Sequence, residues 1–367
     1  MLPFAAVLWR FLWSSNRVRV CSASIHGVVR GMPVIRHRLT SRVLDGNPLG
    51  DPIARDLLVY VPPDYDPAAS RRWPAVLAIV GYTGTGGSLF NVDPLGEPLH
   101  DKLDRMIGKG ALPPIIVAAP DCFTRVGGNQ YINSAGTGRY EDYLVDEIVP
   151  FVDANYRTLP RGQWGVFGKS SGGYGSIVLG MRRPDVFCAI ADHSGDANFE
   201  LCYLPDVPAA LDAFREAGGP AAWLDRYWAD PNRRRRKYHK PINVLGMAAH
   251  YSPNPGAPAA DARIDWPFDL ETGVFRPAVW DRWRAWDPVH MVEGHVHHLR
   301  KLRGIYVDCG THDEFALHWG ARALVKQIRI HGISVRHEEF DDGHMNIPYR
   351  YDVSLPFLAE AILGTQA

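Results

Sequence analysis

The chain of 367 residues is long enough to bury a large core, as one α/β domain or as two smaller ones. Its 40 basic and 40 acidic residues cancel, so no overall field attracts nucleic acid or an anionic membrane surface. A hydrophobic share of 46% with 22% charged residues is ordinary for a soluble enzyme. Composition therefore favours a small-molecule enzyme over a nucleic-acid-binding protein and predicts no stable membrane insertion. It leaves the oligomeric state open.

The first 31 residues differ from the rest, because they contain arginines but neither Asp nor Glu. Arg10 interrupts their apolar beginning, whereas a secretory signal carries its charge before the apolar run. We expect residues 1–31 to be a dispensable extension, with Met32 as an alternative start. A signal peptide and an organelle transit peptide are the competing interpretations.

Cysteine usage favours a reducing compartment. The cysteines are odd in number and widely spread, at positions 21, 122, 188, 202 and 309. Three of them, Cys122, Cys188 and Cys309, lie in or beside apolar runs, as small buried hydrophobic residues do. We expect a cytoplasmic protein, or an exported one if the apolar N-terminal segment is a signal.

From residue 34 onward, apolar runs alternate with helical patterns, which predicts an α/β fold with a mostly parallel sheet. Residues 34–43 and 54–61 are expected to form an opening antiparallel pair. A helix is expected over 140–155, with Pro150 kinking or ending it. The other expected elements are strands at 75–80, 115–119, 164–167, 188–191, 304–308 and 335–340, and helices at 174–181, 314–330 and 354–363.

Residues 196–300 break this rhythm, since they are rich in proline, weakly periodic and carry six of the 11 tryptophans. We expect a cap-like insertion before the 304–308 strand, covering the carboxyl edge of the sheet. The domain at 32–195 and 301–367 would then hold the catalytic residues. Aromatic side chains of the insertion are expected to pack and to line a pocket for an apolar or aromatic substrate, the pocket candidates being Trp266, Trp280, Trp283 and Trp286.

A G-x-S-x-G sequence lies between a predicted strand and a predicted helix, at residues 168–172. Glycines give a sharp strand-to-helix turn the room it needs, and the turn lifts the Ser170 hydroxyl above the sheet edge. The backbone N–H of the next residue then points into the same space, at a helix N-terminus. The pattern predicts that Ser170 is a nucleophile, although a glycine-rich turn alone also produces it.

A serine nucleophile needs a base and a group that orients the base. Candidates follow the later strands in the order acid, then histidine. We predict Asp313 as the acid and His344, behind a glycine near the C-terminus, as the base. The competing acids are Asp308, Glu314, Asp341 and Asp342, and the competing histidines are His312, His318 and His337.

Two backbone donors are needed to hold an oxyanion, and we predict the N–H groups of Tyr82 and Ser171. The glycine-rich stretch at 84–87 lacks the Gly-Lys-Ser/Thr ending of a phosphate loop. A polar stretch with Glu293, His295, His297 and His298 lacks the spacing of a metal site. We therefore expect neither a cofactor nor a metal.

The sequence GKSSGGYG at 168–175 resembles the G-H-S-M-G-G-Y-G motif of the putative-esterase family of α/β-hydrolases. That family includes S-formylglutathione hydrolases, feruloyl esterases, enterochelin-type esterases and mycolyltransferases. Similar stretches are the helix before the nucleophile strand, the acid segment, the histidine loop and the oxyanion loop, at 140–157, 308–315, 342–344 and 81–82. Lys169 and Ser171 depart from the usual histidine and methionine, and the 196–300 insertion exceeds what compact members need.

The resemblance covers roughly residues 50–195 and 300–365 and implies the α/β-hydrolase fold, with Asp313 in the acid role. It implies a serine hydrolase that cleaves a carboxylic ester of a small molecule through an acyl-enzyme. An acyltransferase with the same triad is the nearest alternative. A non-catalytic binding module of this fold is a third interpretation.

Overall fold

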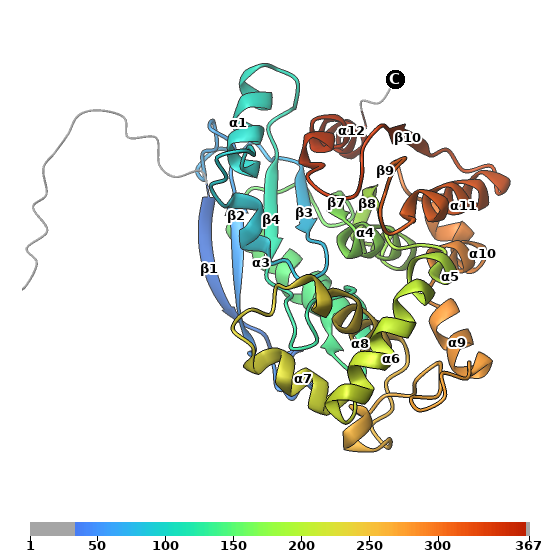
Figure 1. Ribbon diagram of the computed structural model, residues 1–367. Helices are drawn as coiled ribbons and strands as arrows, with labels where there is room; N and C mark the ends of the chain where they lie inside the picture. The colour runs from blue at the N-terminus through green and yellow to red at the C-terminus, as the bar shows by residue number, and fades with distance from the viewer. Residues whose placement is uncertain (1–33, 365–367) are drawn as a thin grey trace, which may run out of the picture. The chain divides into compact units, whose positions relative to one another are not determined.

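A computed structural model describes residues 34–364 of the chain. The strands of its main sheet are β1 (Val34–Thr40), β2 (Ala54–Tyr60), β3 (Ala75–Ile79), β4 (Ile116–Pro120), β7 (Trp164–Lys169), β8 (Phe187–His193), β9 (Gly304–Gly310) and β10 (Arg336–Phe340). Their order in the sheet is β1-β2-β4-β3-β7-β8-β9-β10 (Figure 1). β2 runs against β1 and β4, and the other neighbouring strands pair in parallel. The predicted sheet, with its antiparallel opening pair, is confirmed.

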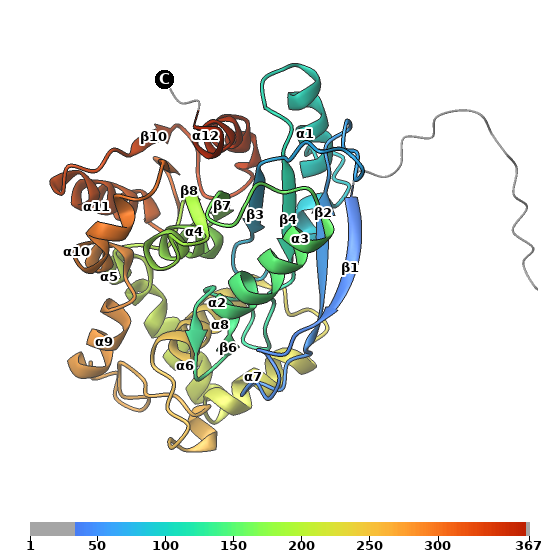
Figure 2. The ribbon, with the colours of Figure 1, turned by 180° about the vertical axis from the view of Figure 1, so that it is seen from behind.

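Helices cover both faces of the sheet (Figures 1 and 2). Side chains of α1 (Leu99–Gly108) and α12 (Tyr351–Leu363) share one apolar cluster with Val76, Ala78 and other residues of one sheet face. Side chains of α4 (Ser171–Arg182) and α11 (Leu317–Ile330) share a second cluster with the alternate residues Leu77 and Ile79. Every residue of β3 and β4 is buried, as expected of parallel strands covered on both faces.

The predicted helix over 140–155 forms, but it is irregular. It consists of α2 (Tyr140–Asp142), a π-helical stretch at Tyr143–Ile148 and α3 (Val149–Asn155). Pro150 lies in the first turn of α3, so the irregular stretch precedes the proline and the helix continues past it. A short separate hairpin, β5 (Asn133–Ser134) with β6 (Gly138–Arg139), lies before it in the chain.

The segment after β8 is helical despite its weak periodicity. It contains α5 (Phe199–Cys202), α6 (Val207–Ala217), α7 (Pro220–Ala229), α8 (His239–Tyr251), α9 (Pro277–Arg284) and α10 (Pro288–Leu299). In four of these helices, α6, α7, α9 and α10, a proline occupies the first turn, where its missing N–H costs nothing. Prolines of this proline-rich segment therefore mark helix starts.

The helices α6, α7, α8 and α9 gather on one side of the molecule, away from α1 and α12 (Figures 1 and 2). In contrast, α10 packs against α4 and α11. The predicted insertion at 196–300 therefore also contains α10, which packs against helices of the predicted catalytic domain, and its boundaries stay a prediction. The described residues belong to one compact unit, so the cap is not a separate domain.

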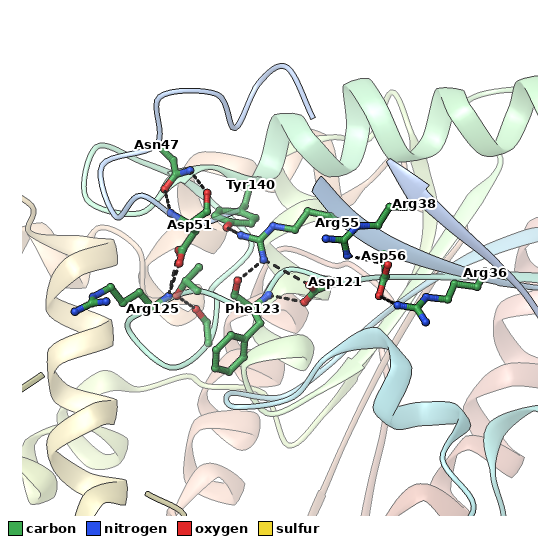
Figure 3. Close-up of polar contacts among 12 residues, drawn as sticks. Arg36, Arg38, Asn47, Asp51, Arg55, Asp56, Asp121, Phe123, Arg125 and Tyr140 are labelled. Carbon is green, nitrogen blue, oxygen red and sulfur yellow. Dashed lines mark hydrogen bonds and ion pairs between the residues drawn. The ribbon is translucent and has the colours of Figure 1, made fainter. Parts of the chain in front are cut away.

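The loop at 121–130, which follows β4, ties the cap to the sheet (Figure 3). Buried Arg55 donates to the carbonyl of Phe123 at 2.5 Å, and the Asp51 carboxylate accepts the Arg125 N–H at 2.9 Å. The Arg125 guanidinium in turn pairs with Asp225 of α7 at 2.7 Å. These contacts link the first strands, the loop and the cap.

The predicted extension at 1–31 and the alternative start at Met32 lie outside the described residues. None of the helices between residues 34 and 364 has the length and apolar character that a bilayer crossing requires. The thiols of Cys122, Cys188 and Cys309 are free and buried, as predicted.

Candidate active site

Ser170 lies on the sharp turn between β7 and α4, and it is half-buried. Its backbone has φ 58° and ψ −126°, a strained conformation for a residue other than glycine. Two backbone hydrogen bonds hold the turn, from the Ser170 N–H to the His193 carbonyl and from the Tyr174 N–H to the Ser170 carbonyl, each 2.9 Å long. The surrounding structure thus fixes a strained serine at the carboxyl end of a central strand.

Glycines allow the neighbouring chain to press against this turn. A Cβ atom at Gly172 would lie 2.4 Å from the Ile79 carbonyl oxygen, at the end of β3. A Cβ atom at Gly81, on the loop after β3, would lie 3.3 Å from the Cβ of Ser170. The predicted role of glycine at 172 is explained by this approach, which also brings the 81–82 loop beside the serine.

His344 and Asp313 form a buried hydrogen-bonded pair. His344 Nδ1 lies 2.7 Å from Asp313 Oδ2, and the two residues are 3% and 5% exposed, which places the pair out of bulk water. Asp313 Oδ1 accepts the N–H groups of Phe315 at 2.9 Å and Leu317 at 3.3 Å. Burial raises the pKa of the Asp313 carboxyl, but the bond and charge of His344 and the two N–H groups outweigh it, so the net pKa is lowered. Asp313 is therefore held as a carboxylate that orients the imidazole.

The loop that carries His344 is fixed from two sides. The His344 backbone N–H donates to Glu314 Oε2 at 2.7 Å. The imidazole ring makes an edge-to-face contact with the Phe315 ring, with the ring centroids 4.8 Å apart. The ring of His239, at the start of cap helix α8, lies 5.3 Å from the Phe315 ring. The cap therefore reaches the surroundings of the imidazole through Phe315.

Lys169, immediately before the serine, is half-buried beside the same loop. Its ammonium lies 4.0 Å from the sulfur of Met345, the residue after His344. Burial lowers the pKa of Lys169, while the charges of Asp313 and Glu314 act in the opposite direction. The residue that replaces the family's usual histidine therefore places a positive charge near two carboxylates.

Asp308, the main competitor for the acid, belongs to another cluster. Its Oδ1 lies 2.7 Å from His193 Nδ1, and its Oδ2 accepts from Arg350 Nε at 2.8 Å and from the Tyr306 hydroxyl at 2.9 Å. His193 Nε2 in turn lies 2.8 Å from Ser354 Oγ on α12. Burial raises the pKa of Asp308, but His193 and Arg350 lower it by more. Its oxygens are thus engaged away from His344.

The predicted oxyanion residues are both well fixed. The Tyr82 hydroxyl donates to the Val126 carbonyl at 2.5 Å, and its ring fills space that a Cβ at Gly128 or Gly246 would need, at 2.5 Å and 1.5 Å respectively. Ser171 is the first residue of α4, where a helix leaves its N–H groups without intrahelical partners. The backbones of both residues therefore lie near Ser170. Ser171 follows it in the chain, and Tyr82 follows Gly81, which packs against the Ser170 side chain.

A buried polar cluster that sequence reasoning missed joins Ser171 to three other side chains. The Ser171 hydroxyl donates to Asp196 Oδ2 at 3.1 Å and accepts from Gln130 Nε2 at 2.8 Å. The Tyr203 hydroxyl also donates to Asp196 Oδ2, at 2.9 Å. Asp196 follows the carboxyl end of β8. Because ligands bind at this edge of an open α/β sheet, a polar residue just after a strand end could have marked Asp196 as a candidate site residue.

The four tryptophans predicted to line the pocket make contacts within the cap and the helical layer. Three indole N–H groups are engaged: Trp266 with the Asp261 carbonyl, Trp280 with Glu200 and Trp283 with Ser252. Trp286 lies beneath the Arg182 guanidinium, with 5.2 Å from the ring centroid to the guanidinium carbon. Within residues 34–364, no hydrogen bond or ring contact joins these indoles to the side chains of Ser170, Asp313 or His344. Their pocket role stays a prediction.

The polar stretch once considered for a metal lies on α10. There Glu293 pairs with His331 at 3.2 Å, and His298 Nδ1 donates to the Met181 carbonyl at 2.6 Å. Among the described residues, the side chains of Glu200, Asp287 and His290 also approach one another. The Asp287 carboxylate already accepts three backbone N–H groups, from Asn198, Phe199 and Val289, and so holds the start of α10.

The profile of the putative esterase family matches residues 53–352. Among solved structures, a ferulic acid esterase is similar, with 19% identity, a TM-score of 0.57, and coverage of 89% of this chain and 98% of that chain. An S-formylglutathione hydrolase from Agrobacterium tumefaciens has 16% identity, a TM-score of 0.52 and coverage of 90% and 95%. A fluorophosphonate-binding serine hydrolase of Staphylococcus aureus has 13% identity, a TM-score of 0.53 and coverage of 90% and 97%. The likeness shows the predicted α/β-hydrolase fold.

Proposed function

Because the chain belongs to the putative esterase family, we propose that it cleaves a carboxylic ester through an acyl-enzyme intermediate on Ser170. The observation that carries this proposal is the buried His344–Asp313 pair, 2.7 Å apart. The strained Ser170 turn adds to it, because strain of this kind persists at functional sites where the surrounding structure enforces it.

In this mechanism Ser170 Oγ attacks the carbonyl carbon of the ester and passes its proton to His344 Nε2. The imidazolium then gives that proton to the leaving alcohol, and the acyl group remains on Ser170. Water attacks the acyl-enzyme with His344 again as the base, which releases the carboxylic acid and restores the serine. Asp313 accepts the hydrogen bond from the Nδ1–H group and stabilises the imidazolium throughout.

The negative charge that develops on the carbonyl oxygen would be held by the backbone N–H groups of Tyr82 and Ser171. Two features support this part. Ser171 is at the N-terminus of α4, where the helix dipole favours an anion, and the Tyr82 side chain is anchored to Val126 and so fixes its own backbone. The substrate is a small-molecule ester.

A fluorophosphonate probe tests the proposal directly, because it reacts with an activated serine and leaves other hydroxyl groups unlabelled. We expect stoichiometric labelling of the full chain, and peptide mapping should place the adduct on Ser170. The Ser170→Ala variant should not be labelled, whereas Ser88→Ala, which changes an exposed loop serine, should be labelled like the wild type. An unlabelled wild-type protein, or an adduct at another serine, would contradict the mechanism.

A further inference from the structure

The buried carboxylate of Asp196 lies against the nucleophile turn. Asp196 comes three residues after β8, and the preceding Gly195 touches the first turn of α4, because a Cβ there would lie 2.7 Å from the Tyr174 N–H nitrogen. The residue is 6% exposed. Ser171, which follows the nucleophile, donates directly to it. The carboxylate is therefore part of the wall immediately beside Ser170.

This carboxylate has only neutral partners. The donors Tyr203 Oη, Ser171 Oγ and Gln130 Nε2 converge on one oxygen, Oδ2, at 2.9, 3.1 and 3.4 Å. Within residues 34–364 no Lys, Arg or His nitrogen forms an ion pair with it. Two other buried acids do form ion pairs, Asp308 with Arg350 and Asp206 with Lys240. Asp192 and Asp287 are buried and, like Asp196, form no ion pair within residues 34–364. Burial raises the pKa of Asp196, and the bond from Tyr203 and the charge of His344 oppose the shift.

A second acceptor of the same cluster is unused. Gln130 is fully buried, and its Nε2 faces Ser171 Oγ at 2.8 Å, but its Oε1 is buried without a hydrogen-bond partner. Gln130 Oε1 is one of 14 buried side-chain N and O atoms without a hydrogen-bond partner among residues 34–364, and it lies in the same cluster as Asp196, where a ligand donor would satisfy it. The Asp196 carboxylate and Gln130 Oε1 are thus hydrogen-bond acceptors in the same cluster.

The charged groups around the proposed catalytic residues also act on this cluster. The charge of His344 acts on Asp196, and the negative groups in the same region, Asp313 and Glu314, face one half-buried cation, Lys169. An anionic substituent would meet net negative charge there. A hydrogen-bond donor on the substrate would instead compensate the acceptors that the protein leaves unsatisfied.

We infer that Asp196 and Gln130 form a subsite for a hydroxyl or amino group of the ester substrate. This inference rests on the proposed function and narrows its substrate class to esters that carry a hydrogen-bond donor near the carbonyl. It adds a polar group to the apolar or aromatic substrate expected from the sequence. A packing role alone would be served at lower cost by a neutral side chain, because a buried charge is expensive to keep.

Matched esters with and without one donor test the subsite. Suitable pairs are methyl butyrate with methyl β-hydroxybutyrate or methyl β-aminobutyrate, methyl phenylpropanoate with its para-hydroxy analogue, and ethyl with hydroxyethyl butyrate. Each kcat/KM is divided by the rate of hydroxide-catalysed hydrolysis of the same ester, which removes intrinsic reactivity. The pairs place the donor on the acyl or the alcohol part, so they also show which part occupies the subsite.

For the wild type we expect a preference of roughly 10- to 100-fold for the donor-bearing member of at least one pair, the effect of one hydrogen bond to a charged acceptor. Asp196→Asn should reduce that ratio to a few-fold, mainly through a higher KM for the donor-bearing ester. Asp206→Asn, which changes a cap carboxylate of equal exposure, 6%, should keep the wild-type ratio. Tyr203→Phe removes one bond to Oδ2 and should lower the ratio less.

The two levels of the proposal fail in different ways. If fluorophosphonate labels Ser170 but no pair shows a preference above twofold, the subsite is wrong and the hydrolase mechanism stands. If Asp196→Asn slows both members of every pair equally, the cluster only positions Ser171 and the subsite is again wrong. Because the wild-type ratios need no variant, they decide the question even if Asp196→Asn does not fold. Absent labelling would instead contradict the proposed function itself.

Discussion

Two sets of Ser, His and Asp side chains can be compared, one proposed as catalytic and one buried elsewhere, and their His–Asp nitrogen–oxygen distances are the same, 2.7 Å. One comprises Ser170, His344 and Asp313, and the other comprises Ser354, His193 and Asp308. In the second array all three side chains are fully buried, and the histidine bonds the serine at 2.8 Å. By hydrogen-bond geometry alone, the second array is the more complete of the two.

The surroundings of the two serines differ. Ser354 is the fourth residue of α12, its side chain is fully buried, and its backbone φ is not positive. Its array also includes Arg350, which ties Asp308 down and makes the cluster a bridge between β8, β9 and α12. Ser170 is half-buried on a strained turn at the start of a helix. Access and backbone strain therefore distinguish Ser170, the proposed nucleophile, from the buried Ser354.

Removing each serine should separate the two arrays most strongly. Ser170→Ala should lower kcat on an activated ester by about 10⁴-fold or more, because the nucleophile is lost, with the thermal midpoint nearly unchanged. Ser354→Ala should keep kcat within about threefold and lower stability by about 1–2 kcal/mol, because His193 loses a buried partner. Steady-state kinetics and urea unfolding measure both effects. An inactive but stable Ser354→Ala variant would reverse the assignment.

The acids provide a second contrast. Asp313→Asn should lower kcat by about 10⁴-fold at almost unchanged stability, because the amide favours the wrong imidazole tautomer. Asp308→Asn should instead destabilise the fold by about 3–5 kcal/mol, because it breaks a buried ion pair with Arg350. Kinetics are compared per folded molecule, with denaturant unfolding for stability. If Asp308→Asn abolishes turnover while Asp313→Asn leaves it intact, the acid has been assigned to the wrong array.

A smaller effect concerns Asp192, which precedes His193 in β8. Burial raises its pKa to about 8, the charge of Asp308 adds to the shift, and the Gly195 N–H opposes it. Since the folded pKa exceeds the unfolded value, the wild type should lose stability from about pH 4 to pH 8 through this group. The side chain of the Asp192→Asn variant stays neutral. The free energy of unfolding of this variant, relative to the wild type, should therefore rise by up to about 1.4 kcal/mol per pH unit. Chemical unfolding at pH 5, 6, 7 and 8 measures the difference, and a constant difference would contradict the shift.

Local signals were sufficient for the sheet and for the positions of the candidate catalytic residues. The runs at 75–79 and 116–120 are apolar throughout because both sheet faces are covered, and the turn at 168–172 contains the glycines that its crowding requires. The bond between His344 and Asp313 joins residues 31 positions apart, yet both follow strand ends at one edge. Strand order along the chain was therefore enough to propose the pair.

Other features depend on contacts that no local pattern encodes. The helix α8 is buried on nearly all sides, so it has no polar stripe to reveal its period, and the sequence of the cap is only weakly periodic. The cluster of Asp196 and Gln130 joins segments 66 residues apart, and neither belongs to a known motif. The choice between Asp308 and Asp313 was open for the same reason, because His193 and Arg350 become neighbours of Asp308 only in the folded chain.

The side chain of Tyr82 has a consequence for how this protein could have diverged. Its ring packs against Gly128 of the 121–130 loop, and its hydroxyl oxygen lies so close to Gly246 of cap helix α8 that a Cβ at that glycine would be 1.5 Å from it. The wall behind the proposed oxyanion donor is thus built partly by the insertion. A cap of this kind is not an interchangeable module, and a graft between relatives would have to carry Tyr82, the loop and α8 together. A change in this part of the cap would therefore also move the side chain behind the proposed oxyanion donor.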